Sequence, residues 1–321
     1  MARARWHRHK DQPNQDLSLC FQAVSGVSEE YRSPSGTEAL VRRVANRLKQ
    51  ASDIYYGHGS NSAHMEAWVL VHGLLKQRVG DSIDEAFERC VDDCVSLRLG
   101  DRVPAAYLTG LAWYFNRWFE VERGVMIPRS PIGEVIETNL RPWLREPPDR
   151  IMDLCCGTGC LGVMAALAFP EASVTLIDID ERALSSARSN VLRHGVSDTV
   201  EILRSDLFEQ LEPNVYDVII ANPPYVSADE FEHLPKEYGY EPRTGLAAGH
   251  DGLACWRSIL SEIGKWMSPN GILVGETGSA TAGFLNAFPS YDIFWPVLER
   301  AVRQEDGGFG VFVADAETFL R

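Results

Sequence analysis

The residues best suited to chemistry form the run Asn222-Pro223-Pro224-Tyr225, which follows the candidate strand Tyr216–Ala221. A residue before a proline avoids the helical region, and two successive prolines fix two φ angles and remove two N–H donors. The run is therefore expected to form a stiff, extended loop. The Asn222 side-chain oxygen and the Pro223 carbonyl can then accept both hydrogens of a planar NH2 group, while Tyr225 stacks on its flat face. The alternative is a proline-rich connector after a buried strand.

A planar amide nitrogen is a poor nucleophile because its lone pair is delocalised. Two acceptors would polarise both N–H bonds and stabilise positive charge as it develops on the nitrogen. Holding that nitrogen in line with a methyl sulfonium would supply much of the rate through proximity, without a strong general base. We therefore expect catalytic roles for Asn222, Pro223 and Tyr225, and substrate binding by Asn222, Pro223, Pro224 and Tyr225.

A second run, residues 153–160, reads Asp-Leu-Cys-Cys-Gly-Thr-Gly-Cys and joins an apolar stretch to a helical one. Its glycines let the backbone turn sharply and approach a ligand closely. Free N–H groups at a helix start favour an anionic group, such as a carboxylate of a bound cofactor. The spacing departs from the dinucleotide-binding pattern, and an ordinary tight turn is the alternative. The cofactor-binding candidates in this run are Cys155, Cys156, Gly157, Thr158 and Gly159.

Asp178 ends the next apolar run and is the candidate for the ribose of the cofactor. A carboxylate at the end of this strand can accept both ribose hydroxyls of a bound adenosine. Asp180 is instead expected to cap the helix that starts at Glu181. No basic residue near Asp178 suggests a site for a 2′-phosphate, which argues against NADP.

These residues need a scaffold, and from Arg150 onward strands and helices alternate. The candidate strands are 151–154, 173–179, 200–204, 216–221 and 271–276, and the helices between them are 159–169, 181–194 and 253–267. Alternation at this spacing implies βαβ units and a parallel sheet. Stretches 293–298 and 309–314 have no room for a crossover helix between them, so that pair is expected to be antiparallel. We predict an α/β fold with a mostly parallel, seven-stranded sheet, which resembles the fold of the class I methyltransferases.

Four segments are expected along the chain. Residues 1–35 look irregular, and residues 36–103 form a helical domain with helices 37–50, from Asn61 or Ser62 onward, and 81–99. Residues 104–149 hold a β-hairpin within 106–127 and a proline-rich linker with a short helix at 132–140. Residues 150–321 form the catalytic domain.

Composition limits the classes of partner. The 321 residues carry a formal net charge of -14, which disfavours stable binding to nucleic-acid phosphate and suits a basic protein partner. The seven cysteines are odd in number and irregular in spacing, as in a reduced, cytoplasmic chain. No apolar run is long enough for a membrane span. The acidic balance favours a packed core over base stacking for the aromatic cluster 113–119.

The run Asn222–Tyr225 resembles a signature of methyltransferases that act on planar exocyclic nitrogens, among them adenine-N6 DNA enzymes and the HemK-type glutamine methyltransferases. Residues 104–137 and 234–253 resemble the hairpin, linker and post-signature segments of the glutamine enzymes. Four shorter stretches resemble the branch that modifies large-subunit ribosomal protein L-three: Tyr56-Gly57-His58-Gly59, Pro128-Arg129-Ser130-Pro131-Ile132, Asp153-Leu154-Cys155 and Glu237-Tyr238.

The resemblance implies methyl transfer from S-adenosylmethionine to a glutamine side chain of that basic ribosomal protein. It implies that residues 155–159, Asp178, Leu207 and Asn222 line the cofactor site. Two positions depart from the family's pattern. Cys156 replaces a threonine usual in the branch, and Leu207 stands where release-factor enzymes often have an aromatic residue. The helical domain is expected to recognise the protein substrate.

Other functions stay open at this point. They are the same chemistry on peptide-chain release factors, an adenine-N6 nucleic-acid methyltransferase, and a catalytically silent assembly factor. Cys155, Cys156 and Cys160 lack the second ligand pair of a zinc site, so no metal is expected. Three acidic residues that follow the run Asn222–Tyr225 are expected either to attract a basic substrate segment or to form a solvated face. They are Glu237, Glu241 and Asp251.

Overall fold

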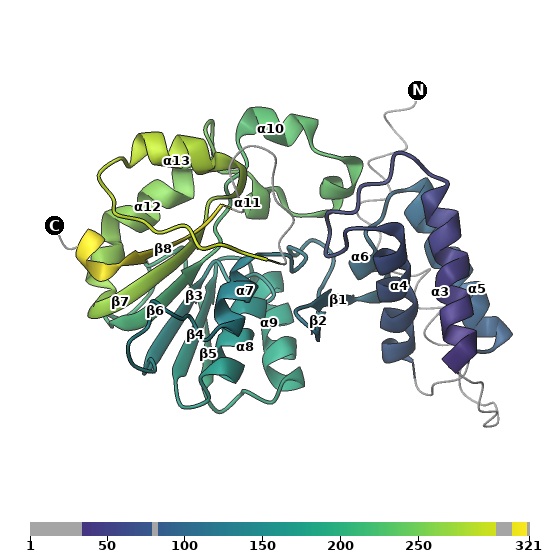
Figure 1. The fold of residues 1–321 in the computed structure, drawn as a ribbon, viewed down its shortest axis with the longest axis horizontal. Coiled ribbons are helices and arrows are strands. Elements are labelled where there is room, and N and C mark those ends of the chain that lie inside the picture. The colour runs from purple at the N-terminus through teal and green to yellow at the C-terminus, as the bar shows by residue number, and fades with distance from the viewer. Residues whose placement is uncertain (1–33, 79–82, 300–309, 320–321) are drawn as a thin grey trace. The chain divides into compact units, whose positions relative to one another are not determined.

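The computed structural model describes residues 34–78, 83–299 and 310–319, shown as a ribbon in Figure 1. The chain divides between Thr109 and Gly110 into two compact units. We call them the helical unit, which ends at Thr109, and the sheet unit, which begins at Gly110. The expectation of an irregular tail falls almost entirely outside the described residues, and a helix already begins at Pro34. Within the described residues, no helix is long and apolar enough to cross a membrane.

The helical unit contains the three helices expected from the sequence and a fourth. They are α3 (Pro34–Lys49), α4 (Ala63–Gln77), α5 (Glu85–Gly100) and α6 (Ala105–Thr109). Ser62 caps α4 by accepting from the Met65 N–H at 3.2 Å, as one of the two predicted starts required.

Three boundaries in this region were predicted wrongly. The first helix starts at Pro34 instead of Thr37, because proline suits the first helical position. The helix α5 starts after Asp84, whose side chain accepts from the Phe87 N–H at 2.8 Å and so fixes the boundary. Residues 105–109 are helical instead of extended, since the Pro104 carbonyl accepts from Tyr107 and Leu108.

A buried ion pair joins two helices of the helical unit. Arg98 of α5 donates through Nε to Glu66 of α4, and its Nη2 donates to the Tyr55 carbonyl at 2.7 Å. The side chains of Arg98 and Glu66 are 1% and 4% exposed. Burying either charge alone is expensive, so the pair depends on both partners.

In the sheet unit the order of strands is β5-β4-β3-β6-β7-β8, with the last strand antiparallel to its neighbour and the others parallel. The strands are β3 (Arg150–Leu154), β4 (Ser173–Asp178), β5 (Val200–Arg204), β6 (Tyr216–Ala221), β7 (Met267–Glu276) and β8 (Val311–Asp315). A separate hairpin pairs β1 (Leu111–Tyr114) with β2 (Arg117–Glu120). The predicted class I methyltransferase fold is confirmed.

One predicted strand is missing from the described part of the sheet. Stretch 293–298 makes a single antiparallel bridge, between Phe294 and Val313, so the described sheet has six strands instead of seven. Pro296 lacks the N–H that would continue the ladder.

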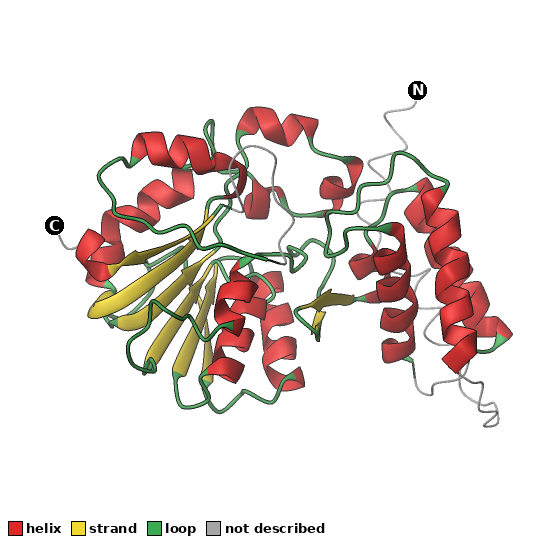
Figure 2. Ribbon diagram, viewed as in Figure 1, coloured by secondary structure: helices red, strands yellow, loops and turns green. Residues whose placement is uncertain are grey.

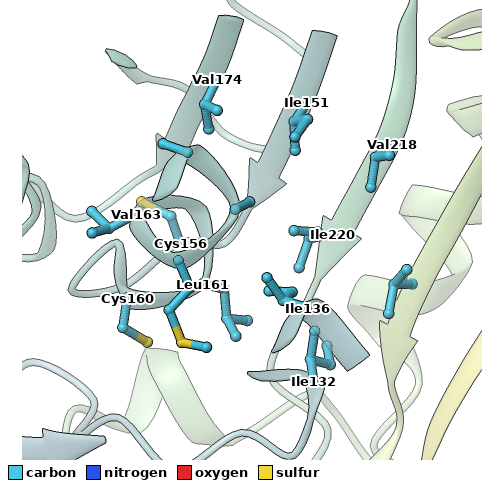
Figure 3. Close-up of a cluster of buried hydrophobic side chains, with 14 of the residues drawn as sticks. Ile132, Ile136, Ile151, Cys156, Cys160, Leu161, Val163, Val174, Val218 and Ile220 are labelled. Atoms are coloured by element: carbon cyan, nitrogen blue, oxygen red, sulfur yellow. The ribbon is translucent and has the colours of Figure 1, made fainter. Parts of the chain in front are cut away.

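Helices lie on both sides of the sheet (Figure 2). One face packs against α7 (Ile132–Glu137), α8 (Cys160–Ala168) and α9 (Glu181–Arg193). Figure 3 shows this core, where Ile151, Val174, Val218 and Ile220 of the strands meet side chains of α7 and α8. The other face packs against Trp256 of α12 (Ala254–Glu262) and Phe284 of α13 (Thr281–Ala287). The remaining helices are α10 (Ala228–His233), α11 (Arg243–Leu246), η1 (Lys236–Tyr240), η2 (Ile263–Lys265), η3 (Gly278–Ala280) and η4 (Ala316–Thr318).

Asn190 of α9 fixes the β1–β2 hairpin to the rest of the sheet unit. Its side chain accepts from the Glu120 N–H at 2.6 Å and donates to the carbonyls of Glu120 and Thr158, each at 2.9 Å. This fully buried amide therefore ties the hairpin to the turn that follows β3.

The buried pair gives a test of the helical unit. Replacing Glu66 by Leu leaves the Arg98 guanidinium buried without its carboxylate, and we expect a loss of about 3–5 kcal/mol in the free energy of unfolding. The double variant Glu66→Leu/Arg98→Met removes both charges and should recover most of that loss. Urea unfolding followed by circular dichroism measures both. Arg42→Met, which breaks an exposed pair with Glu38, is the control and should change nothing measurable. Equal losses in the single and double Glu66 variants would contradict the assignment.

Candidate active site

A cavity of about 370 Å³ lies at the carboxyl ends of β3, β4 and β6. The strand order reverses here, because β3 has β4 on one side and β6 on the other, and such switch points bind ligands in open α/β sheets. The expected residues that line the cavity are Cys155, Cys156, Gly157, Thr158, Asp178, Leu207, Asn222 and Pro224. The structure thus brings together residues from four separate parts of the sequence.

The turn after β3 has an unusual backbone. Cys155, Gly157 and Gly159 all have positive φ, at 60°, 55° and 71°. A Cβ built on Gly157 would meet no atom within 4 Å, so its bare backbone faces open space in the cavity wall. A Cβ on Gly159 would lie 2.9 Å from Leu176. Gly159 is therefore required for packing and is not part of the cavity lining, unlike the other residues of the predicted run.

Cys156 and Cys160, on either side of Gly157–Gly159, belong largely to the apolar core. Cys156 and Cys160 are 6% and 7% exposed and lie among the side chains drawn in Figure 3. Burial raises the pKa of both thiols, which keeps them neutral. Among the described residues, no cluster of His, Cys, Asp and Glu could hold a metal ion.

Asp178 is anchored by the backbone of two turns. One carboxyl oxygen accepts from the Gly157 N–H at 2.8 Å and the other from the Asp180 N–H at 2.9 Å. Burial raises the pKa of this carboxyl, and the two hydrogen bonds partly oppose the rise. A carboxylate has about four acceptor positions, so lone pairs remain for two further donors. Asp180 caps α9 as predicted, accepting from the Arg182 N–H at 2.9 Å.

Asp153 is a buried carboxyl group that bonds the backbone of α8, which the sequence did not indicate. It is 1% exposed, one oxygen accepts from the Gly162 N–H at 2.8 Å, and the other has no hydrogen-bond partner among the described residues. Burial raises its pKa to about 7. An acidic residue inside an otherwise apolar strand end was the available signal.

The loop Asn222–Tyr225 after β6, which we call the acceptor loop, contains a buried oxygen without a hydrogen-bond partner in the described part of the chain. Asn222 and Pro224 line the cavity, and the Asn222 Oδ1 atom is buried with no hydrogen-bond partner among the described residues. Pro223 and Tyr225 are not part of the cavity lining. Tyr225 is partly buried, and its hydroxyl donates to the Glu276 carboxylate at 2.9 Å. The loop therefore offers one unsatisfied acceptor beside the cavity, which is uncommon for a buried side chain.

Two acidic residues beyond this loop are neither a solvated face nor available to a substrate. Glu237 is 1% exposed and Glu241 is 6% exposed. Glu241 accepts from both terminal guanidinium nitrogens of Arg129, with Nη2 at 2.8 Å. It also accepts from the Ile127 N–H at 3.0 Å. Asp251 is exposed and paired with Arg257. The sequence-based interpretations, a solvated face and attraction of a substrate, are therefore both wrong for Glu237 and Glu241, because both are buried. For Glu241 the cause is its pairing with Arg129, which is distant in sequence.

The residues of the cavity fit S-adenosylmethionine. Asp178 keeps acceptor capacity for a ribose, and the open backbone at Gly157 admits close approach of a polar group. Apolar side chains on the same wall, among them Ile179 and Leu207, suit a flat base. Leu207 itself has a φ of 49°, a conformation that only few non-glycine residues adopt.

Comparison with known proteins gives a consistent result. A family model described as "Methyltransferase small domain" matches residues 139–234. A ribosomal protein uL3 glutamine methyltransferase from Bordetella pertussis is 40% identical over 267 residues, covering 80% of this chain and 89% of that protein. Proteins with the same name from Francisella tularensis and Burkholderia pseudomallei are 35% and 38% identical, over 84% and 80% of this chain and 87% and 88% of their own lengths.

The carboxylate of Asp178 should dominate cofactor affinity. Asp178→Ala removes the expected ribose acceptor and the partner of the Gly157 N–H, and we expect the Kd for S-adenosylmethionine to rise about 100-fold or more. Isothermal titration calorimetry measures it. Glu181→Ala, which removes an exposed carboxylate paired with Arg188 at the start of α9, is the matched control and should leave the Kd unchanged. Equal affinities for the wild-type and the Asp178 variant would refute the assignment.

The raised pKa of Asp153 makes stability depend on pH. The folded protein holds this proton up to about pH 7, whereas an aspartate exposed in the unfolded chain releases it at about pH 4. The contribution of Asp153 is therefore fully present below about pH 4 and is lost as pH rises to about 7, by up to about 4 kcal/mol. Asp153→Asn stays neutral and keeps an acceptor for Gly162. Urea unfolding without cofactor should show the variant gaining stability over the wild-type as pH rises; a difference independent of pH would exclude this origin.

Proposed function

The chain belongs to the family of ribosomal protein uL3 glutamine methyltransferases, and we propose that it methylates the side-chain amide nitrogen of a glutamine on that ribosomal protein. The observation that carries the choice of acceptor is the buried Asn222 Oδ1, which lines the cavity without a hydrogen-bond partner among the described residues. A side-chain amide of the substrate would supply the missing donor.

S-adenosylmethionine supplies an electrophilic methyl group on a sulfonium. The chain's own residues would hold it through Asp178 at the ribose and through the turn of Cys155, Cys156, Gly157 and Thr158, with Leu207 against the base. Gly157 has a positive φ, which glycine adopts readily, and it places no side chain in the space in front of its backbone. The polar groups of the wall thus orient the ligand, and the apolar ones exclude water from it.

The acceptor loop would hold the glutamine amide. Asn222 Oδ1 and the Pro223 carbonyl each accept one hydrogen of the NH2 group, which fixes the nitrogen and leaves its remaining face toward the methyl group. Tyr225 stacks on the amide plane. The two acceptors stabilise the positive charge that develops on nitrogen, and a protonated amide is acidic enough to lose its extra proton to water. No residue of the loop needs to act as a strong base.

The helical unit would recognise the protein substrate, as the sequence suggested. Contacts remote from the reacting nitrogen can then fix its orientation in the cavity. The net charge of -14 favours a basic ribosomal protein and disfavours stable contact with bare nucleic acid.

The test is the mass of purified uL3 after incubation with this protein and S-adenosylmethionine. We expect a gain of about 14 mass units, one methyl group, mapped by peptide analysis to a glutamine amide.

Asn222→Ala removes one acceptor and should lower kcat about 100- to 1000-fold, with a much smaller change in cofactor Kd. Asn286→Ala, an exposed asparagine of α13, is the matched control and should keep the wild-type rate. Methylation of release factors instead of uL3 would refute the substrate, and an active Asn222 variant would refute the mechanism.

A further inference from the structure

Tyr225 of the acceptor loop is closely packed on two sides and hydrogen-bonded at its hydroxyl. A Cβ on Gly278 would lie 2.2 Å from its ring, and a Cβ on Gly252 would lie 2.2 Å from its carbonyl oxygen. Its hydroxyl donates to the Glu276 Oε1 atom at 2.9 Å. Two glycines thus let neighbouring backbone close on the tyrosine, and one carboxyl group fixes the far end of its ring.

Glu276 is itself held rigidly. It is the last residue of β7, the strand that pairs with β6, from whose end the acceptor loop starts. Its carbonyl accepts from the Trp256 indole at 3.2 Å, and the next residue, Thr277, donates its N–H to Gly310 at 2.7 Å. The side chain is 4% exposed. Burial raises the pKa of this carboxyl, while hydrogen bonds from Ser130 and Tyr225 lower it in part.

The second donor to Glu276 comes from the other side of the site. Ser130 donates its hydroxyl to the Glu276 Oε2 atom, and both Ser130 and its neighbour Arg129 line the cavity. Arg129 is paired with Glu241 from beyond the acceptor loop. One buried carboxyl group therefore bonds both the proposed stacking residue and the linker segment that forms part of the cavity wall.

We propose that Glu276 is a positioning residue for methyl transfer: it sets the orientation of the Tyr225 ring and, through Ser130, holds the acceptor loop in register with the cavity wall. This inference rests on the proposed function, because it assigns Tyr225 to the amide plane of the substrate. Burying a carboxyl group without an ion-pair partner is unfavourable in free energy. An apolar residue of similar size would fill the same space without that loss. The two hydroxyl donors give the carboxyl a geometric task that packing alone does not require.

The experiment compares steady-state kinetics on uL3 for four variants. Glu276→Leu removes both acceptors and should lower kcat about 10- to 100-fold, because small misplacements of a reacting group have effects of that size. The Kd for S-adenosylmethionine should change less than about threefold. Glu276→Gln keeps an acceptor for Tyr225 and a donor for Ser130, and should restore most of the lost kcat. Tyr225→Phe should lower kcat to a similar extent, and Glu276→Leu/Tyr225→Phe no further than either single variant.

The matched control is Asp217, in the same sheet but at the opposite end of β6. Its carboxyl also accepts from a serine hydroxyl, that of Ser268 at 2.7 Å. Asp217→Leu should lower thermal stability and leave kcat unchanged, which separates loss of positioning from loss of stability.

Four outcomes would overturn the inference: a wild-type kcat for Glu276→Leu or for Tyr225→Phe, no rescue by Glu276→Gln, or additive effects in the double variant. If Glu276→Leu does not fold, Tyr225→Phe and Glu276→Gln decide the matter between them. Wild-type protein that methylates no glutamine of uL3 would overturn the proposed function, and this inference with it. A methylating wild-type with an equally active Tyr225→Phe variant would overturn the inference alone.

Discussion

Asp178 joins the ends of three neighbouring strands, and the shape of the cavity depends on it. Its side chain accepts from Gly157 after β3, and its carbonyl accepts from the Ser205 N–H after β5 at 3.1 Å. The Cys156 N–H donates to the Ile177 carbonyl at 2.9 Å and extends the contact between β3 and β4. Because the turn at 155–159 has positive φ at three positions, it needs such external bonds to stay in one conformation. The carboxyl proposed for the ribose is thus also the one that shapes the cofactor wall.

Buried carboxyl groups recur around this edge of the sheet. Asp153, Glu241 and Glu276 are almost fully removed from water and Asp178 is partly buried, and each accepts hydrogen bonds from another part of the chain. A carboxylate transferred from water without partners is strongly unfavourable, so each of these groups stabilises only the arrangement that satisfies it. The apolar packing of the sheet between two helical layers supplies the stability that makes such groups tolerable. These carboxyl groups therefore link loops at this edge of the sheet that contain little regular structure.

The sequence predicted the elements whose signal is local. Apolar runs such as 218–221 indicate parallel strands, and a serine or aspartate before a helix indicates its start, as at Ser62 and Asp180. It failed where a distant partner decides. Glu241 pairs with Arg129, 112 residues earlier, and its charge alone suggested a surface position. Glu276 ends a strand in a sequence that gives no sign of Ser130 or Tyr225 as its neighbours. The stretch 293–298 has strand-forming residues, but Pro296 lacks the donor for a full ladder.

Methylation of an amide nitrogen places unusual demands on a protein. The amide N–H is a very weak acid, so removing its proton beforehand would require a base far stronger than any carboxylate in this site. What a protein can supply instead is orientation and a pair of acceptors that become better partners as charge develops. Both depend on rigidity, since an acceptor that can turn away loses its effect. The two prolines of the acceptor loop, the close approach of Gly252 and Gly278 to Tyr225, and the buried carboxyl of Glu276 all restrict motion, and none of them donates or removes a proton from the proposed substrate. The chemistry expected of this site and the physical character of its surroundings therefore agree.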